Sequence, residues 1–271
     1  MLSPNEVTAL AAELDLAEKS RVQVGHFSSR FPRMTMEDGY RISREWVRLK
    51  QAAGRHIIGH KIGLTSRAMQ QSSQIDEPEF GTLLDDMLYP CPEARQLALP
   101  TERFIKPRVE VELAFVLQER LFGTAVTEQD VIRSTAYICP AIEIIDARIE
   151  QFDAKTGAPR KVFDTISDNA ANAAIVTGAR QVPIDGVDLR WCGAILTKNG
   201  VVEETGLAAG VLGNPLRGVA WLAHRLAPWG EALEPGQIVL AGSFTRPVAA
   251  VRGDTFEADF GPLGVLNFCF E

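Results

Sequence analysis

Two glutamates, Glu110 and Glu112, alternate with apolar residues in the segment 108–117, Arg-Val-Glu-Val-Glu-Leu-Ala-Phe-Val-Leu. Such alternation is typical of a β-strand with one apolar face, and it places both carboxylates on the opposite face, roughly 7 Å apart along the chain. That face continues with Ala114 and Val116, so we expect it to be partly buried. Because buried carboxylates repel each other and resist desolvation, we expect a positive group between them.

A third glutamate, Glu143, stands alone within the apolar run 136–146. An ionised and unpaired carboxylate in such a run would be very costly, so we expect Glu143 to be neutral, paired or bound to a metal. With Glu110 and Glu112 it would offer hard oxygen ligands only, and such a set favours Mg²⁺ or Mn²⁺ over zinc. Three carboxylates leave about three of six octahedral positions open for water and a bidentate 2-oxo or 2-hydroxy acid. The metal would then polarise the substrate oxygen and stabilise an enolate.

Lys61 and Glu79 are candidates for moving protons or positioning water at this metal. Lys61 shares a strand face with Gly59 and Gly63, which indicates open space or a close approach beside it; the alternative is an edge-strand lysine turned to solvent. Glu79 lies in Pro78-Glu79-Phe80-Gly81, a fixed loop of the kind that can present a carboxylate to a pocket, although the segment taken alone favours an exposed acidic loop.

The elements that must position these groups can be predicted from periodicity and capping residues. Helices are expected over 4–19 after the cap residue Ser3, from a capping box at 35–38 to Gly54, after Ser66, over 128–134, and from Asn214-Pro215 to near Gly230. We interpret the first two as a packing or oligomerisation layer. Strands are expected over 56–64, 108–117, 136–146, 190–198, 201–204, 237–240, 248–251, 255–260 and 265–270. Prolines at 90, 92 and 100 indicate a linker over 91–101. The sequence thus predicts an α+β protein with an N-terminal portion, 1–98, that contributes Lys61 and Glu79, and a catalytic β-roll domain, 99–271, that holds the metal.

Composition excludes several classes of function. The 271 residues are 46% hydrophobic and carry a net charge of −7 without a lysine or arginine cluster, so we expect no nucleic-acid partner. The four cysteines are far apart, which favours free thiols over zinc ligands. No secretory signal and no membrane-length apolar stretch is evident, so we expect a cytoplasmic protein that does not bind membranes. Phosphate-loop, dinucleotide-binding, zinc-protease and Gly-x-Ser-x-Gly motifs are all absent.

The chain resembles the fumarylacetoacetate hydrolase superfamily, and within it the hydratase and decarboxylase branch. The motifs that carry the resemblance lie at 45–50, 59–66, 107–115, 160–172 and 242–247. The resemblance implies a mixed β-roll or barrel with an N-terminal helical portion, and homo-oligomers. It also implies metal carboxylates at Glu110, Glu112 and Glu143 and an active-site lysine at Lys61. Where relatives have Pro-Asp-Phe/Tyr-Gly, this chain has Glu79, so its acid/base carboxylate is one methylene longer.

We therefore expect a metal-dependent hydratase of the 4-hydroxyphenylacetate (homoprotocatechuate) meta-cleavage route. It would convert 2-hydroxyhepta-2,4-dienedioate, or its 2-oxo-4-ene tautomer, to 4-hydroxy-2-oxoheptanedioate. The distal carboxylate of this diacid needs a cation, and the candidates, which the sequence does not rank, are Arg108, Arg160, Lys161 and Arg246. Residues expected to line the pocket are Ser167, Asp168, Ser243 and Thr245. The alternatives are hydration of the five-carbon analogue, decarboxylation of a 2-oxo-enedioate, carbon–carbon hydrolysis of an acylpyruvate, and a non-catalytic subunit that kept the fold.

Overall fold

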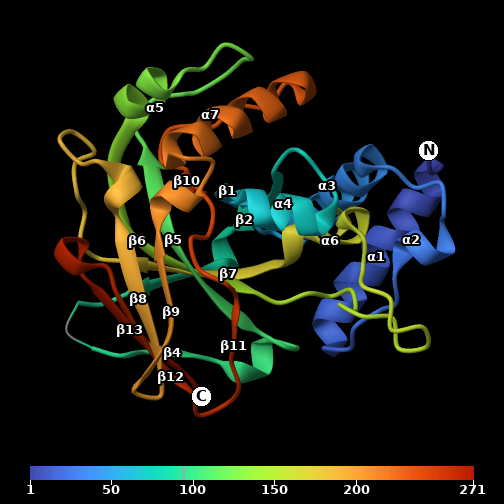
Figure 1. Cartoon of the computed structure of the whole chain (residues 1–271). Helices are drawn as coiled ribbons and strands as arrows, with labels where there is room; N and C mark the ends of the chain where they lie inside the picture. Colours follow the sequence, from blue (N-terminus) through green and yellow to red (C-terminus); the bar gives the residue numbers. More distant parts are fainter. Residues whose placement is uncertain (94) are drawn as a thin grey trace.

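Two β-sheets and a group of N-terminal helices make up the computed structural model, which describes residues 1–93 and 95–271 (Figure 1). The strands of the larger sheet are β1 (Ile57–Gly63), β2 (Glu79–Leu84), β3 (Leu88–Cys91), β5 (Arg108–Leu117), β6 (Thr135–Ile145), β7 (Asn172–Gly178), β10 (Ile238–Leu240) and β11 (Val248–Ala249). Their order is β2-β1-β10-β5-β6-β7-β3, and β11 pairs with β5. The smaller sheet consists of β4 (Leu97–Leu99), β8 (Gly193–Lys198), β9 (Val201–Leu207), β12 (Thr255–Asp259) and β13 (Val265–Phe270), in the order β4-β13-β12-β8-β9. The predicted α+β class is confirmed.

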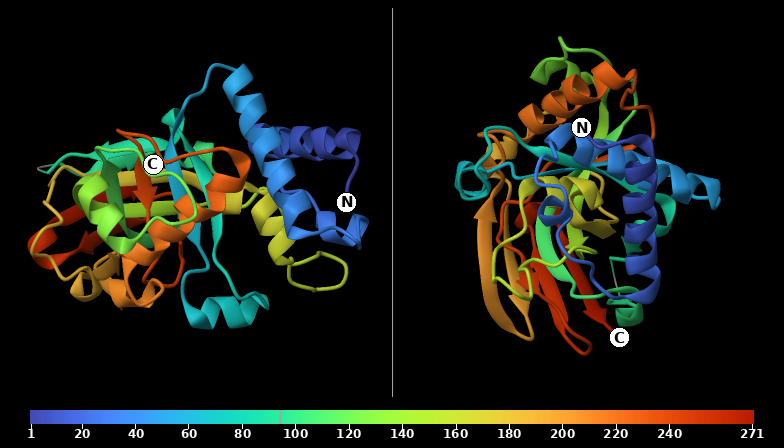
Figure 2. Two further views of the ribbon diagram at one scale, coloured as in Figure 1. Left: turned by 90° about the horizontal axis from the view of Figure 1, so that it is seen from above. Right: turned by 90° about the vertical axis from the view of Figure 1, so that its right-hand side faces the viewer.

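The helices gather mainly outside the sheets. They are α1 (Pro4–Ser20), α2 (Phe27–Arg30), α3 (Met36–Ala52), α4 (Arg67–Ser73), α5 (Glu128–Ser134), α6 (Val162–Ser167) and α7 (Pro215–Leu226). The left view in Figure 2 shows α1 and α3 at one end of the molecule, beside the sheets, and α4 projecting from its body. No helix in the described part of the chain has the length and apolar character that crossing a membrane requires.

The N-terminal helices begin with the capping chemistry that the sequence indicates. The Ser3 side chain accepts a hydrogen bond from the N–H of Glu6, and the Thr35 side chain accepts one from the N–H of Asp38. Each acidic side chain bonds back to the N–H of its cap residue. These boxes satisfy backbone donors that a helix start leaves free, which explains why both helices form where they were expected.

The long strands β5 and β6 form the centre of the larger sheet. The alternate apolar residues Val109, Val111, Leu113 and Phe115 of β5 are at most 1% exposed, as the alternation predicts. They belong to the same buried cluster as aromatic residues of β12 and β13, so the smaller sheet packs on this face. The opposite face of β5 carries Glu110 and Glu112. Because the smaller sheet does not cover this face, the two glutamates are available for a functional site.

The structure corrects the expected setting of Glu79 and decides between the two alternatives for Lys61. Glu79 opens β2 instead of lying in a loop, because β2 pairs antiparallel with β1 and places Glu79 opposite Gly63. Lys61 is not a solvent-facing lysine on an edge strand: β1 lies between β2 and β10, and Lys61 is only 3% exposed. Gly59 is required by the neighbouring strand, since a Cβ there would lie 1.8 Å from the carbonyl oxygen of Ile238.

Element boundaries differ from the sequence-based expectation at a few places. The strand expected over 190–198 begins only at Gly193, because Leu189–Trp191 forms a 3-10 turn capped by Asp188. The expected linker contains β4, which becomes a strand by pairing with β13. The predicted division between residues 98 and 99 stays a prediction, and it does not coincide with a break between sheets, because β1, β2 and β3 share a sheet with β5, β6 and β7.

Candidate metal centre and active site

Three glutamates converge on the face of the larger sheet opposite to the one that packs on the smaller sheet. Glu110 lies directly opposite Glu143 in the antiparallel pair of β5 and β6, and Glu112 follows Glu110 on the same face of β5. One carboxylate oxygen of each residue lies within 4.8 Å of the corresponding oxygens of the other two. Glu112 and Glu143 are buried, whereas Glu110 is partly exposed.

The electrostatics of these glutamates are unfavourable without an added cation. Burial, and then the neighbouring Glu143, raises the pKa of Glu110 to about 8 and the pKa of Glu112 well above its usual range. Glu112 Oε2 accepts a hydrogen bond from the N–H of Gly242 at 2.8 Å. The other oxygen of Glu112, and Oε2 of Glu143, have no hydrogen-bond partner within the described residues. A divalent cation with hard-oxygen preference would use these oxygens and relieve the repulsion, so the residues present fit such an ion.

Lys61 supplies the positive charge that the chain itself brings to the cluster. Its Nζ lies 3.1 Å from Glu143 Oε1. Burial alone would lower the pKa of Lys61, but the surrounding glutamates, Glu143 first, raise it overall, so the ammonium stays charged. The single positive charge of Lys61 cannot neutralise three ionised carboxylates. A bound divalent cation would supply the missing positive charge.

Glu79 faces the same space as Lys61. Burial raises the pKa of Glu79 to about 7, although Lys61 and Arg160 act in the opposite direction. Its Oε2 has no partner in the described part of the chain. A Cβ on Gly63 would lie 3.1 Å from Glu79 Oε1 and 3.4 Å from Lys61 Nζ, so the place of a side chain at residue 63 is taken by these two groups.

The segment 242–247 is tied to β5 through backbone and hydroxyl groups. Thr245 Oγ1 accepts a hydrogen bond from the N–H of Val111 at 3.1 Å. Ser243 Oγ donates to the carbonyl oxygens of Thr245, at 2.9 Å, and of Val111, at 3.3 Å. Both hydroxyls thus hold the segment whose Gly242 N–H binds Glu112. Contact of Ser243 and Thr245 with a substrate stays a prediction.

Ser167 and Asp168, also expected to line the pocket, lie deeper in the protein. Ser167 Oγ donates to the carbonyl oxygen of Phe163 at 2.7 Å. Asp168 forms an ion pair with the guanidinium of Arg148 and accepts the backbone N–H groups of Arg148, at 2.7 Å, and Ile149, at 3.2 Å. Both side chains are fully buried, and a role in binding substrate stays a prediction for each.

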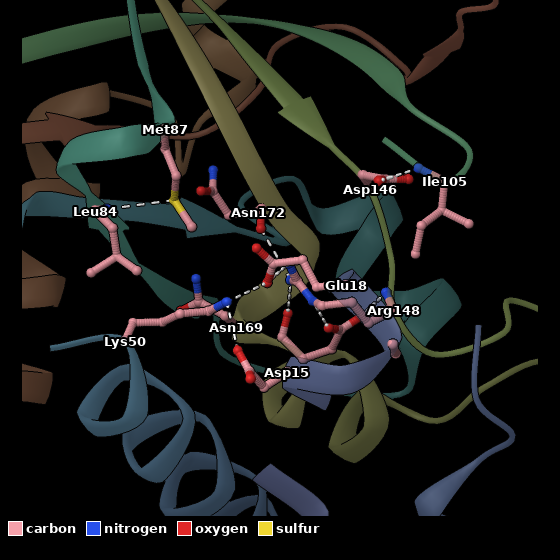
Figure 3. A network of polar contacts seen from close by, with 12 residues as sticks. Asp15, Glu18, Lys50, Leu84, Met87, Ile105, Asp146, Arg148, Asn169 and Asn172 are labelled. Atoms are coloured by element: carbon pink, nitrogen blue, oxygen red, sulfur yellow. Dashed lines mark hydrogen bonds and ion pairs between the residues drawn. The ribbon is translucent and has the colours of Figure 1, made fainter. Parts of the chain in front are cut away.

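Arg148 and Asn172 connect this region to the glutamates, and we did not single out either one from the sequence. Arg148 Nη2 donates to the carbonyl oxygen of Asn172 at 3.0 Å, and Asn172 Nδ2 donates to Glu143 Oε1 at 2.8 Å. Figure 3 shows Arg148 beside Glu18 of α1, close to Lys50 of α3. The signal that could have revealed Arg148 is an arginine two residues after the apolar strand 136–146, where an unpaired charge would be costly.

The four candidate cations for a distal carboxylate are not all brought to the site. Arg246 is 83% exposed and pairs with Glu204 at 2.7 Å on the smaller sheet, and Lys161 is exposed at the start of α6. Arg108 and Arg160 are partly buried. Arg108 precedes Glu110 by two residues on the same strand face, and Arg160 lies close enough to Glu79 to counteract the rise of its pKa.

The chain is similar to known proteins along its whole length. Residues 56–271 match the family model described as fumarylacetoacetate (FAA) hydrolase C-terminal. Over the full length of both chains, the sequence is 54% identical across 270 residues to 2-oxo-hept-4-ene-1,7-dioate hydratase from Escherichia coli. It is 36% identical over 239 residues, 88% of each chain, to 2-hydroxyhexa-2,4-dienoate hydratase from Comamonas testosteroni. The solved structure of 4-oxalocrotonate decarboxylase from Pseudomonas putida G7, complexed with magnesium and adipate, matches with a TM-score of 0.93 at 34% identity and covers 100% of this chain and 99% of that one.

Proposed function

This chain belongs to the fumarylacetoacetate hydrolase family, and from that premise we propose that it is a metal-dependent hydratase of a seven-carbon dienoic diacid. It adds water to 2-hydroxyhepta-2,4-dienedioate, or to its tautomer 2-oxo-hept-4-ene-1,7-dioate, and gives 4-hydroxy-2-oxoheptanedioate. The observation that carries the proposal is the 54% identity, over the full length of both chains, to a hydratase with that substrate in its name. The converging glutamates beside Lys61 and Glu79 provide the chemistry that this reaction needs.

We propose that Glu110, Glu112 and Glu143 hold one divalent cation, Mg²⁺ or Mn²⁺. The unpartnered oxygens of Glu112 and Glu143 support this assignment, as does the magnesium in the solved relative. When bound, the cation would polarise the C2 oxygen of the substrate and stabilise negative charge that develops there. Oxygen ligands of this kind do not by themselves distinguish the two ions.

Glu79 is assigned the proton transfers. A carboxyl whose pKa lies at about 7 holds and releases a proton near neutral pH, which suits general acid–base catalysis. Loss of the C2 hydroxyl proton with protonation at C5 converts the dienol to an enone whose C4 is electrophilic. Water then adds at C4 while a carboxylate accepts its proton, and protonation at C3 completes the addition. Lys61, which stays charged, holds Glu143 in place and orients oxygen atoms of the substrate.

The same site could start other reactions of a 2-oxo acid, and a product assay separates them. Loss of the dienol absorbance in the presence of Mg²⁺ or Mn²⁺, with 4-hydroxy-2-oxoheptanedioate as product, is the expected result. Release of carbon dioxide would indicate a decarboxylase instead, and formation of pyruvate with a second acid would indicate an acylpyruvate hydrolase. Faster turnover of the five-carbon analogue would indicate the shorter-substrate hydratase.

Finer points of the proposal concern its cellular setting. We place the enzyme in the meta-cleavage catabolism of 4-hydroxyphenylacetate, because the proposed substrate is a seven-carbon diacid. Four cysteines without a disulfide suit a reducing cytoplasm.

The exposed apolar residues Trp191, Ile195 and Leu207 lie on and beside β8 and β9 and suit contact with another copy, so we propose a homo-oligomer. Light scattering of the purified protein tests the last point.

A further inference from the structure

We infer that Arg160 binds the distal C7 carboxylate of the substrate and thereby selects the seven-carbon diacid over a five-carbon monoacid. This inference rests on the proposed function, because it takes the reacting carbons C4 and C5 to lie at Glu79. It selects Arg160 from the four candidate cations for the distal carboxylate, which the sequence alone does not rank.

The first argument is the order of groups across the site. Lys61 contacts Glu143 of the glutamate cluster at 3.1 Å and meets Glu79 beside Gly63. Arg160 Nη1 donates to the carbonyl oxygen of Ile149, whose own N–H donates to Asp168. Asn169, the next residue, accepts from the N–H of Thr82 and donates to its carbonyl oxygen on β2, the strand that begins at Glu79. The charge of Arg160 accordingly opposes the rise in the pKa of Glu79. A diacid with C1 and C2 at the glutamates and C4 and C5 at Glu79 would extend further toward Arg160. Six carbon–carbon bonds span roughly 7 Å, so C7 lies only a few ångströms beyond the reacting carbons.

The second argument is that hydrogen bonds hold Arg160 in place while its guanidinium forms no ion pair among the described residues. Its backbone N–H donates to the carbonyl oxygen of Gln151 at 2.9 Å, and its Nη1 donates to that of Ile149 at 3.3 Å. Within the described residues no carboxylate lies within ion-pair distance of this guanidinium, and Asp168 is already paired with Arg148. A partly buried guanidinium presents a planar fork that matches a carboxylate, which a diacid substrate would supply.

The third argument excludes the other cations. Arg246 is neutralised by Glu204 and is 83% exposed on the smaller sheet. Lys161 turns to solvent at the start of α6. Arg108 lies two residues before Glu110, at the end of the site where the C1 carboxylate binds, and therefore cannot distinguish a diacid from a monoacid.

The test compares Arg160→Gln with wild type on two substrates. We expect kcat/KM for 2-hydroxyhepta-2,4-dienedioate to fall roughly 100-fold, because a charged partner of the carboxylate is lost. For 2-hydroxypenta-2,4-dienoate, which has no distal carboxylate, it should change by less than about threefold. Lys155→Gln is the matched control, since it removes one positive charge from the same segment at an exposed position. Equal losses on both substrates in Arg160→Gln would overturn the inference.

A binding measurement separates failure of this inference from failure of the proposed function. Heptanedioate should bind the Mg²⁺-loaded wild type more tightly than heptanoate, and Arg160→Gln should reduce this preference at least tenfold, whichever reaction the enzyme catalyses. Arg160→Lys, which keeps the charge but not the fork, should retain part of the preference and serves if the glutamine variant does not fold. An undiminished preference in both variants refutes the role of Arg160. Absence of hydration by wild type, with the preference intact, refutes only the proposed reaction.

Discussion

Two clusters of buried and partly buried acidic side chains lie on either side of Asn172, and they are neutralised in different ways. In the junction cluster, Asp15 and Glu18 pair with Lys50 (Figure 3). Asp168 pairs with Arg148 in the same cluster. In the glutamate cluster, which consists of Glu79, Glu110, Glu112 and Glu143, the one side-chain ion pair within the described residues is that of Glu143 with Lys61.

The difference shows which cluster belongs to the architecture and which to the chemistry. Where the chain supplies its own cations, as at Arg148, the acidic groups fasten the N-terminal helices to the sheet. Where it leaves the Oε1 of Glu112 and the Oε2 of Glu143 without partners, the charge must be balanced from outside. Asn172 joins the two clusters, because its carbonyl oxygen accepts from Arg148 and its amide donates to Glu143.

The largest effect is expected from Glu112→Gln, which removes a carboxylate charge from the glutamate cluster. Turnover should fall about 10³-fold or more, because several kcal/mol of charge stabilisation by the metal is lost. The dienol absorbance assay measures this. Glu257→Gln replaces a strand glutamate on the exposed face of the smaller sheet and should leave turnover unchanged. Retained activity in Glu112→Gln would remove this residue from the metal site.

Arg148→Met tests whether the junction cluster stabilises the fold. It leaves Asp168 buried without its partner, so the free energy of unfolding should drop by about 3 kcal/mol. Urea denaturation of the metal-free protein measures the change, and Arg148→Lys, which keeps the charge but not the fork, should lose less. A change below about 0.5 kcal/mol would show that the junction cluster does not stabilise the fold.

Asn172→Ala tests the connection between the clusters. Loss of its hydrogen bond to Glu143 should weaken the affinity for Mg²⁺ by about 10- to 100-fold, because groups that orient a metal ligand commonly have effects of this size. Titration calorimetry measures the affinity. Asn267→Ala on β13, in the other sheet, is the control. Unchanged affinity would mean that Glu143 does not depend on Asn172.

A smaller effect is expected on the pH dependence of stability, to which the glutamate cluster should contribute. In metal-free protein the pKa of Glu110 rises, through burial and then Glu143, from an ordinary 4.5 to about 8. Because the unfolded chain releases this proton at lower pH, stability should decrease as pH rises from about 4.5 to about 8. Glu112 and Glu79, with raised pKa values, act in the same direction. Thermal unfolding measures the slope.

Glu110→Gln should make this slope shallower, and saturating Mg²⁺ should diminish it, since the ion stabilises the ionised carboxylates. A stability that increases with pH across the same interval in the metal-free protein would contradict the assignment of raised pKa values to the glutamate cluster.

The parts of the fold that follow from local rules could be predicted from the sequence. The strand 108–117 and the caps at Ser3 and Thr35 are set by alternation and by side-chain hydrogen bonds within four residues. Glu143 could be identified as a partner because a lone acidic residue in an apolar run is costly.

What could not be predicted depends on contacts between distant segments. Glu79 was expected in a loop and becomes a strand residue only because β1 pairs beside it. The bond between Asn172 and Glu143 depends on how β7 follows β6, and the pairing of Arg148 with Asp168 depends on the path of the intervening chain. Only the structure shows that Arg246 forms an ion pair with Glu204, whereas Arg160 is not paired with an acidic side chain among the described residues.

The central claim is that the glutamate cluster binds a divalent cation, and titration calorimetry with Mg²⁺ and Mn²⁺ tests it most directly. One ion should bind per chain, and protons should be released on binding because Glu110 and Glu112 have raised pKa values in the metal-free protein. Two buffers of different ionisation enthalpy reveal that release. The double variant Glu110→Gln, Glu112→Gln should bind neither ion. Absence of binding to wild type, or equal binding to the double variant, would contradict the claim.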